Sequence, residues 1–279
     1  MEFLQPATWR EALEIKAAHP EALPIAGGTD VMVEINLDHR RPETVMDLTR
    51  IRELSEWGTD KDWLLVGSGV SYTRLIDELA DRVPGLAMAS RTVGSPQIRN
   101  RGTIGGNLGT ASPAGDAHPP LLASGAWIEL ASASGARRCP IDDFFIGPKK
   151  SVMRSDELIR GVVLPVARGT QQFSKVGTRN AMVIAVCSFA VNVDRSRRRV
   201  GTGIGSAGPT PLRAAEAEDF IAGELDWENR EPPSEATVKR FGELVAAAAK
   251  PIDDVRGTAA YRRHALSVMA QRCLAWAWA

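Results

Sequence analysis

Two short glycine-rich segments constrain this chain more than any other feature of its sequence. They are Ala26-Gly27-Gly28-Thr29-Asp30 and Thr103-Ile104-Gly105-Gly106-Asn107, and a small polar residue follows each glycine pair. Because glycine has no Cβ and tolerates positive φ, successive backbone amides in such a segment can converge on one anion. A hydrogen bond to a charged group contributes roughly 1.5–3 kcal/mol, whereas micromolar binding requires about 8 kcal/mol. One segment alone is therefore marginal, while two together predict a site for a diphosphate group.

Each segment also has a plainer interpretation. Gly27-Gly28 alone is more typical of a tight turn than of a ligand site. The second segment is harder to explain as a turn, because Arg99-Asn100-Arg101-Gly102 precedes it and Asp116 follows it closely. Such a density of turn-forming and hydrogen-bonding residues costs conformational entropy on folding, so it indicates a functional requirement.

The composition is that of a globular protein and excludes several classes of function. The chain has 279 residues, 44% of them hydrophobic, which suffices for a substantial core and about two domains. Lys and Arg total 34, as do Asp and Glu, whereas nucleic-acid-binding domains normally have a basic surplus. The N-terminus shows no secretory signal, and the longest apolar run, residues 182–193, is shorter than the ~20 residues that span a bilayer. We therefore expect a cytoplasmic protein with neither a membrane span nor a nucleic-acid partner.

The cysteines and histidines predict no metal site in this chain. Cys139, Cys187 and Cys273 are far apart and form no C-x-x-C pair, so the sequence encodes neither a zinc ribbon nor an iron–sulfur cluster. The pattern Asp116-x-His118 lacks a third ligand nearby and is better read as an ordinary loop histidine.

Hydrophobic periodicity divides the chain into three sections, residues 1–57, 58–168 and 169–279. In the first, Thr8 and Glu11 form a capping box for a helix over residues 9–18, and residues 44–48 read as a buried strand. The second section shows strands over 63–66, 126–131 and 158–164 and a helix over 74–83. The third shows strands over 172–176, 183–193 and 200–206, a charged hairpin turn over 194–199, and helices over 214–222, 235–249 and 259–277.

Two further glycine patterns resemble nucleotide-binding motifs without their surroundings. Gly67-Ser68-Gly69 follows a strand, but Tyr72 occupies the place of the third glycine, so we interpret it as a turn. Residues 203–208 match G-x-G-x-x-G in letters, yet Pro209 and Pro211 remove amides that a helix N-terminus would present.

Beyond the two glycine segments, several stretches together resemble one known family. The chain is similar to the FAD-binding medium subunits of the molybdenum hydroxylases, the family of xanthine dehydrogenase and carbon monoxide dehydrogenase. The likeness covers nearly the whole chain and is carried by residues 25–30, 97–107, 110–116, 173–179, 207–213 and 254–262.

The resemblance implies an α+β architecture. Two subdomains form the FAD-binding fold of the PCMH type, which is vanillyl-alcohol-oxidase-like, and a C-terminal α/β domain of the CO dehydrogenase flavoprotein type follows. It also implies the cofactor-binding residues. The two glycine segments lie at the phosphates, Asp116 binds a hydroxyl-bearing part of FAD, and Ile159 and Lys175 lie near the flavin ring. The full set is Pro24, Ile25, Ala26, Gly27, Gly28, Thr29, Asp30, Val31, Thr103, Ile104, Gly105, Gly106, Asn107, Asp116, Ile159 and Lys175.

The implied function is electron transfer inside a larger oxidoreductase. A small subunit with 2Fe–2S clusters would deliver electrons to FAD, a large molybdopterin subunit would oxidise the substrate, and the complex would be a dimer of heterotrimers. The final acceptor, NAD⁺, oxygen or another molecule, stays open because no specific NAD motif is present. Two alternatives are a self-contained FAD oxidase, which often has a histidine near the first segment that is absent here, and a scaffold that has lost FAD.

Overall fold

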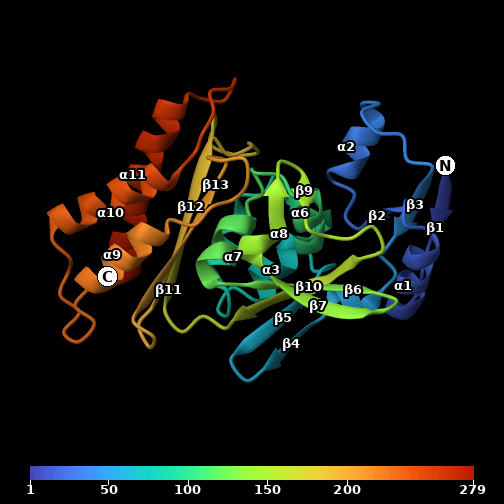
Figure 1. The fold of residues 1–279 in the computed structure, drawn as a ribbon, viewed down its shortest axis with the longest axis horizontal. Coiled ribbons are helices and arrows are strands. Elements are labelled where there is room, and N and C mark those ends of the chain that lie inside the picture. The colour runs from blue at the N-terminus through green and yellow to red at the C-terminus, as the bar shows by residue number, and fades with distance from the viewer.

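Three β-sheets follow one another along the long axis of the computed structural model, which describes residues 1–279 (Figure 1). A three-stranded sheet lies in the N-terminal part, a five-stranded sheet in the middle, and a second three-stranded sheet in the C-terminal part. Apart from Trp57, which is the last residue of the first predicted section and lies in the middle sheet, each sheet falls within one predicted section, and the exact section boundaries stay a prediction. No helix is both long and apolar enough to cross a membrane.

The N-terminal part is a small parallel sheet with one covering helix. Strands β1 (Glu2–Leu4), β3 (Thr44–Asp47) and β2 (Leu23–Ile25) pair in that order, and α1 (Trp9–Ala18) has its predicted bounds. Thr8 accepts from the Glu11 amide, whereas the Glu11 carboxylate accepts from Ala7, one residue before the position that a capping box would use. The apolar residues after the first glycine segment form helix α2 (Val31–Asn36), which has no buried residue and stands apart from the sheet (Figure 1).

The middle part has a five-stranded antiparallel sheet that is covered on one face by short helices. Its strand order is β4 (Trp57–Asp60), β5 (Trp63–Gly67), β10 (Leu158–Pro165), β6 (Trp127–Ser132) and β7 (Gly135–Pro140). A turn of 3₁₀ helix, η1 (Arg52–Ser55), precedes β4, and the short strands β8 (Phe145–Gly147) and β9 (Lys150–Ser151) form a separate pair. The helices are α3 (Tyr72–Glu78), α4 (Pro84–Arg91), α5 (Pro96–Arg101), α6 (Ile104–Thr110), α7 (His118–Ser124) and α8 (Ile141–Phe144).

The helix expected over residues 74–83 ends five residues earlier than predicted, and a second helix begins after it. Helix α3 ends at Glu78, and Val83 is the N-cap of α4. Proline is tolerated in a first helical turn but not in a helix interior, so Pro84 begins a new helix.

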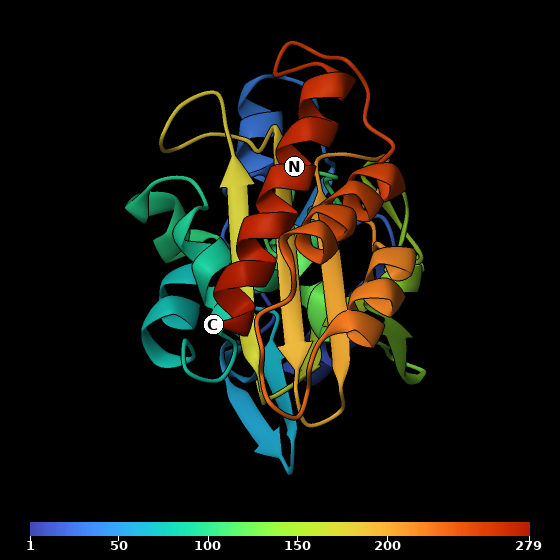
Figure 2. The same ribbon diagram turned by 90° about the vertical axis from the view of Figure 1, so that its left-hand side faces the viewer.

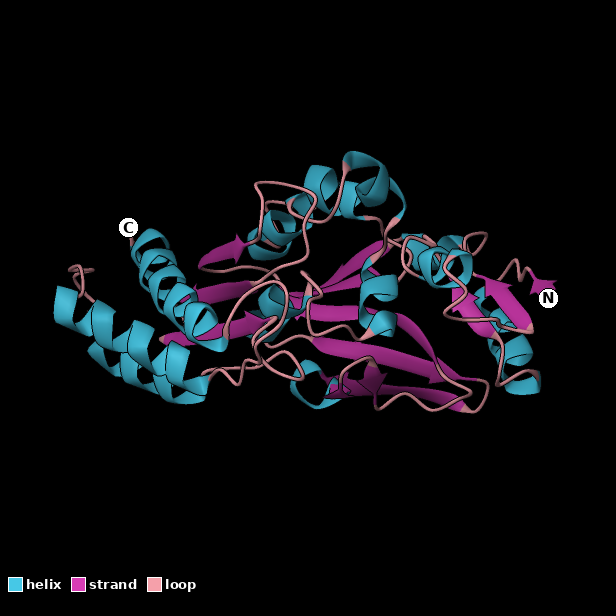
Figure 3. Ribbon diagram, turned by 90° about the horizontal axis from the view of Figure 1, so that it is seen from above, coloured by secondary structure: helices cyan, strands magenta, loops and turns pink.

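The C-terminal part is an antiparallel meander with three helices on one face (Figures 2 and 3). Strands β11 (Thr170–Val176), β12 (Cys187–Asp194) and β13 (Arg199–Gly205) carry α9 (Ala215–Glu224), α10 (Glu235–Ala248) and α11 (Ala259–Trp278). The predicted hairpin turn over 194–199 is confirmed. Strand β12 begins four residues later than expected, because the last residue of β11, Val176, pairs with Cys187.

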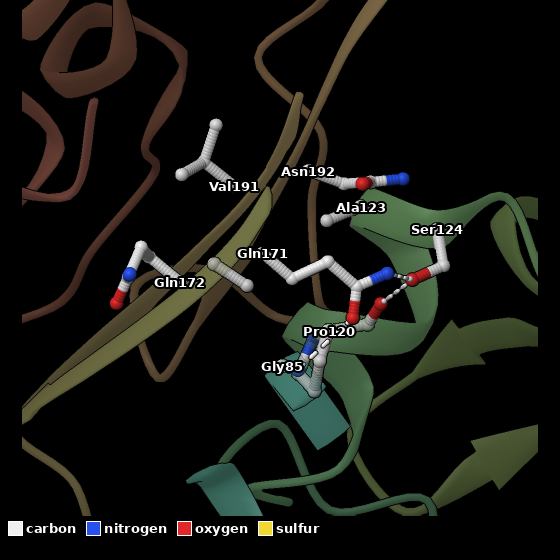
Figure 4. A pocket seen from close by; sticks show the side chains of 9 residues that line it. Gly85, Pro120, Ala123, Ser124, Gln171, Gln172, Val191 and Asn192 are labelled. Atoms are coloured by element: carbon white, nitrogen blue, oxygen red, sulfur yellow. Dashed lines mark hydrogen bonds between the residues drawn. The ribbon is translucent and has the colours of Figure 1, made fainter. Parts of the chain in front are cut away.

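Helix α7 of the middle part packs directly on the opposite face of this sheet. A Cβ on Gly201 or Gly203 of β13 would overlap a carbonyl oxygen of α7, so only glycine permits this close approach. The G-x-G-x-x-G match over 203–208 therefore includes packing glycines. Gln171 of β11 joins the two parts: its Oε1 accepts from the Gly85 amide at 2.9 Å, and its Nε2 donates to Ser124 Oγ at 3.3 Å (Figure 4). The crevice around Gln171 has no free volume for a ligand.

Candidate functional site

The first glycine segment presents an uninterrupted row of free backbone amides. Strand β2 ends at Ile25, and none of the amides of residues 26–31 donates to a backbone carbonyl. Gly28 has φ +73°, a conformation that other residues rarely adopt, and the Asp30 side chain does not cap α2. Because buried or half-buried amides in proteins are nearly always bonded, this row is suited to an anionic ligand.

The second glycine segment is not a loop but the first turn of α6. Thr103 is its N-cap and accepts from Gly106 at 3.0 Å, while Gly105 donates to Ser68 at 2.9 Å. The amides of Ile104 and Asn107 also have backbone acceptors, Val70 and Thr103. The expectation that both segments offer a row of bare amides is therefore wrong for the second. The first amides of a helix have no partner within the helix, but here the Thr103 side chain and the carbonyl oxygens of Ser68 and Val70 accept from them.

The two segments nevertheless lie against each other. A Cβ on Gly27 would overlap the carbonyl oxygen of Arg101 and lie 3.0 Å from the Cα of Gly102. Lys149 forms a second link, because its Nζ contacts Glu34 of α2 at 2.6 Å and its amide donates at 3.0 Å to Ala111 at the end of α6. The two segments are thus far apart in the sequence but adjacent in the fold, as the prediction of one shared site requires.

The two glycines of the second segment have different surroundings. Gly105 is buried, and a Cβ there would overlap the Ser68 side chain and lie 2.7 Å from its carbonyl oxygen. Gly106 is exposed, and a Cβ there would meet only Thr103 Oγ1 at 3.2 Å. Gly109, one turn later, has only Ile159 Cδ1 within 4 Å of such a Cβ, at 3.9 Å. Gly105 therefore packs α6 onto the body, while Gly106 and Gly109 leave one face of α6 free of side chains above Ile159.

Asp116 and Lys175 form a buried ion pair between the middle and C-terminal parts. Lys175 Nζ lies 2.6 Å from Asp116 Oδ2, with side-chain exposures of 7% and 10%, and also donates to the Thr92 carbonyl oxygen at 3.2 Å. Burial raises the pKa of Asp116 to about 6, although the Lys175 ammonium opposes this shift. The second carboxylate oxygen, Oδ1, is buried without a partner. A bare acceptor on a charged carboxylate is suited to a hydroxyl or N–H group of a ligand.

Sequence analysis missed two other buried residues around Asp116. Tyr72 Oη and His118 Nδ1 are buried without hydrogen-bond partners, as is the Asn107 side-chain oxygen. Burial and the nearby Asp116 carboxylate raise the pKa of Tyr72, so its phenol stays protonated and can donate. The only sequence signal for His118 was the Asp116-x-His118 pattern, and nothing marked Tyr72 because its neighbourhood is made by distant segments.

His118 fixes the backbone between α6 and Asp116. Its Nε2–H donates to the Asn107 carbonyl oxygen at 3.3 Å, and burial lowers its pKa to about 4. Its ring packs against Phe145 with centroids 4.5 Å apart, and a Cβ on Gly115 would overlap it. A neutral, fully buried imidazole thus holds the turn on which Asp116 lies.

Other features of the molecule do not form part of this site. A hollow of about 680 Å³ lies over the sheet face that includes Trp63 and Trp127, and it contains none of the predicted residues. No group of three or more His, Cys, Asp or Glu side chains is placed to hold a metal ion, and the three cysteines are buried and form no disulfide.

Comparisons with known proteins agree over the whole chain. Residues 1–167 match the family model "FAD binding domain in molybdopterin dehydrogenase", and residues 172–277 match the "CO dehydrogenase flavoprotein C-terminal domain". The FAD subunit of nicotinate dehydrogenase from Eubacterium barkeri is 32% identical over 80% of this chain and 79% of that protein. The xanthine dehydrogenase FAD-binding subunit of Escherichia coli O157:H7 is 30% identical over 96% and 92%.

The fold is likewise similar to a solved structure. A chain of carbon monoxide dehydrogenase from Hydrogenophaga pseudoflava superposes with a TM-score of 0.90 at 26% identity, covering 100% of this chain and 98% of that one.

The residues present fit the groups of an FAD molecule. The free amides of residues 26–31 suit a pyrophosphate, the bare face of α6 admits a bulky group, and the unpartnered oxygen of Asp116 suits a hydroxyl. With both family models matched, this chain belongs to the FAD-binding flavoprotein subunits of the molybdenum hydroxylase family, the oxidoreductases related to xanthine dehydrogenase and carbon monoxide dehydrogenase.

Proposed function

We propose that this chain binds FAD and transfers electrons between a partner subunit and a final acceptor. The electrons would come from 2Fe–2S clusters of the partner, and the acceptor would be NAD⁺, oxygen or another molecule. The observation that carries the proposal is the row of free amides at residues 26–31 beside the bare face of α6. FAD, when bound, supplies a centre that exchanges electrons both singly and in pairs.

We assign the phosphate end of the site to the two glycine segments. Residues 24–31 would surround the pyrophosphate, with Gly27, Gly28 and Thr29 nearest to it. From the second segment, the exposed Gly106 would face the cofactor together with Asn107 and the N-cap Thr103, while Ile104 and Gly105 hold α6 in place. The first segment would supply the row of amide donors to the pyrophosphate, because the amides of residues 104–107 already have acceptors inside the protein.

The ring end of the site would lie between the middle and C-terminal parts. Asp116 would accept a hydrogen bond from FAD through its unpartnered oxygen, and Ile159 would contact the ring from β10. Lys175 would place a positive charge near the ring, which stabilises a reduced flavin that carries negative charge. These three residues come from different segments, and the Lys175–Asp116 ion pair joins two of them.

The proposal requires other subunits. The cysteines of this chain are buried and far apart, so clusters would belong to a small 2Fe–2S subunit and molybdopterin to a large subunit. Medium-chain relatives such as glyceraldehyde dehydrogenase medium chain from Sulfolobus acidocaldarius, 29% identical over 97% of this chain, support an assembly of this type. We propose a cytoplasmic dimer of heterotrimers.

The first experiment is to denature the purified chain and to measure released FAD. We expect about one FAD per chain, and reduction of that FAD when the co-purified partner complex receives substrate. A colourless preparation from a flavin-replete host that takes up no added FAD would favour the scaffold alternative. Turnover by the isolated chain without any partner would favour the self-contained oxidase.

A further inference from the structure

Arg262 of α11 is a buried cation that the proposed function does not use. Its side chain is 4% exposed. The segment that ends with it, residues 254–262, is one of the stretches that carry the family resemblance, but none of its residues has been given a role in the site. Leaving a buried guanidinium without acceptors costs several kcal/mol. The hydrogen-bond acceptors of Arg262 therefore show which segments it holds together.

Arg262 binds three segments at once. Its Nη1 donates to the carbonyl oxygens of Val186 at 2.8 Å and Ser206 at 2.5 Å, and its Nη2 contacts Asp254 Oδ1 at 2.5 Å. Val186 precedes β12, Ser206 follows β13, and Asp254 lies in the turn before α11. Ser206 has φ +57°, so the chain leaves β13 through a strained residue that this hydrogen bond stabilises.

Two of these bonds continue to the buried ion pair. The Ser206 amide donates at 2.9 Å to the carbonyl oxygen of Pro113, three residues before Asp116. The Val186 amide donates at 2.8 Å to the carbonyl oxygen of Val176, the residue after Lys175. One guanidinium therefore fixes the backbone next to both members of the pair, although it contacts neither side chain.

We infer that Arg262 is a positioning residue. It holds the backbone next to Asp116 and next to Lys175 so that the two side chains meet across the boundary between the middle and C-terminal parts. This inference rests on the proposed function for its effect on FAD, while the link between Arg262 and the ion pair is a property of the chain alone. A residue that merely stabilised the C-terminal helices would not alter the ionisation of a carboxyl group in another part of the molecule.

The first test uses the apoprotein and needs no flavin. The pKa of the Asp116 carboxyl is measured by NMR titration in the wild type, in Arg262→Gln and in Arg263→Gln, whose arginine is the exposed neighbour on α11. Burial raises the pKa of Asp116 and the Lys175 ammonium opposes that rise, so an ion pair that lengthens while Asp116 stays buried gives a higher Asp116 pKa. We expect a higher Asp116 pKa in Arg262→Gln and no change in Arg263→Gln. An unchanged Asp116 pKa in folded Arg262→Gln would overturn the inference.

The second test is a double-mutant cycle on FAD binding and on the flavin reduction potential. Lys175→Met alone is expected to retain FAD and to lower the potential. Arg262→Gln should lower the potential in the same direction and weaken FAD binding about tenfold, within the range of coupled neighbouring residues. In the double variant the potential should equal that of Lys175→Met, because Arg262 acts through Lys175. Additive shifts would contradict that coupling.

Arg262→Lys keeps the inference testable if Arg262→Gln does not fold. The lysine preserves the buried charge but lacks the planar fork of donors that serves Val186 and Ser206 together with Asp254. We expect a folded protein with a smaller rise in the Asp116 pKa, and a wild-type value would overturn the inference. Failure of every variant and the wild type to bind FAD would refute the proposed function instead, while the apoprotein titration would still decide the role of Arg262.

Discussion

In the first glycine segment the amides of residues 26–31 donate to no carbonyl of the chain, whereas in the second segment those of residues 104–107 are all bonded inside the protein. Both segments contain a Gly-Gly pair before a small polar residue. The first uses glycine to leave donors free and to permit a positive φ, and the second uses it to bring a helix close to the body and to keep its outer face bare. The Gly-Gly pair therefore provides free hydrogen-bond donors in the first segment and close packing in the second.

Gly105→Val should give the largest effect on stability. A Cβ at this position overlaps the Ser68 side chain and lies 2.7 Å from the Ser68 carbonyl oxygen, so α6 must move away from the body. Overpacking of this kind costs about 3 kcal/mol or more. Urea unfolding of the apoprotein measures the loss, and a wild-type midpoint would show that Gly105 is not a packing glycine.

Gly106→Val is the matched change one residue later, and it should separate binding from folding. The added side chain meets only Thr103 Oγ1 at 3.2 Å and occupies the bare face of α6. We expect the free energy of unfolding of the apoprotein to stay within about 1 kcal/mol of the wild type, since valine is not worse than glycine in a helix. FAD retention should be abolished. Wild-type FAD occupancy in this variant would show that the second segment does not face the cofactor.

Gly28→Ala should have a moderate effect that a control variant can isolate. Gly28 and Gly125 have φ values of +73° and +65°, so alanine costs roughly 1–2 kcal/mol at either position. Only Gly28 lies in the row of free amides, while the surroundings of Gly125 are open. Titration with FAD should show about tenfold weaker binding for Gly28→Ala and none of that loss for Gly125→Ala. Equal affinities in the two variants would remove the first segment from the site.

The parts of the fold that sequence predicts best are those with strong local patterns. Helix α1 has its expected bounds because Thr8 is an N-cap, and the β12–β13 hairpin follows from a charged turn between two apolar runs. The short helices α4 to α7 were missed because they are rich in Gly, Pro and Ser, whose helix propensity is low, and depend on packing for their stability.

For the site, sequence identifies residues but not what their backbone does. The family resemblance identified Asp116 and Lys175 as site residues, and in the structure Lys175 Nζ lies 2.6 Å from Asp116 Oδ2. Sequence could not reveal that Gly27 lies against Arg101, or that Tyr72 and Arg262 act near Asp116, because each relation joins segments far apart in the chain. Nor could it show that the Gly106 amide is bonded to Thr103, since that depends on α6 starting at this residue.

His118→Gln should change the pH dependence of stability. The folded-state pKa of His118, about 4, lies below its ordinary value of 6.5, so its contribution to stability is present above pH 6.5 and is lost as the pH falls towards 4. Asp116 acts in the opposite sense. Its folded pKa of about 6 lies above the ordinary 3.8, so its contribution is present below pH 3.8 and is lost as the pH rises through 6.

Acidification should therefore lower the stability of the wild-type apoprotein through His118. A glutamine at this position can still donate a hydrogen bond to the Asn107 carbonyl oxygen, but it does not titrate. We expect the loss of stability between pH 6.5 and 4 to be smaller in His118→Gln, by at most about 3 kcal/mol. Urea unfolding at several pH values measures this difference, with His264→Gln, an exposed histidine of α11, as the control. If both variants lose stability as steeply as the wild type, His118 does not stay neutral in the fold, and the turn that carries Asp116 must be held in another way.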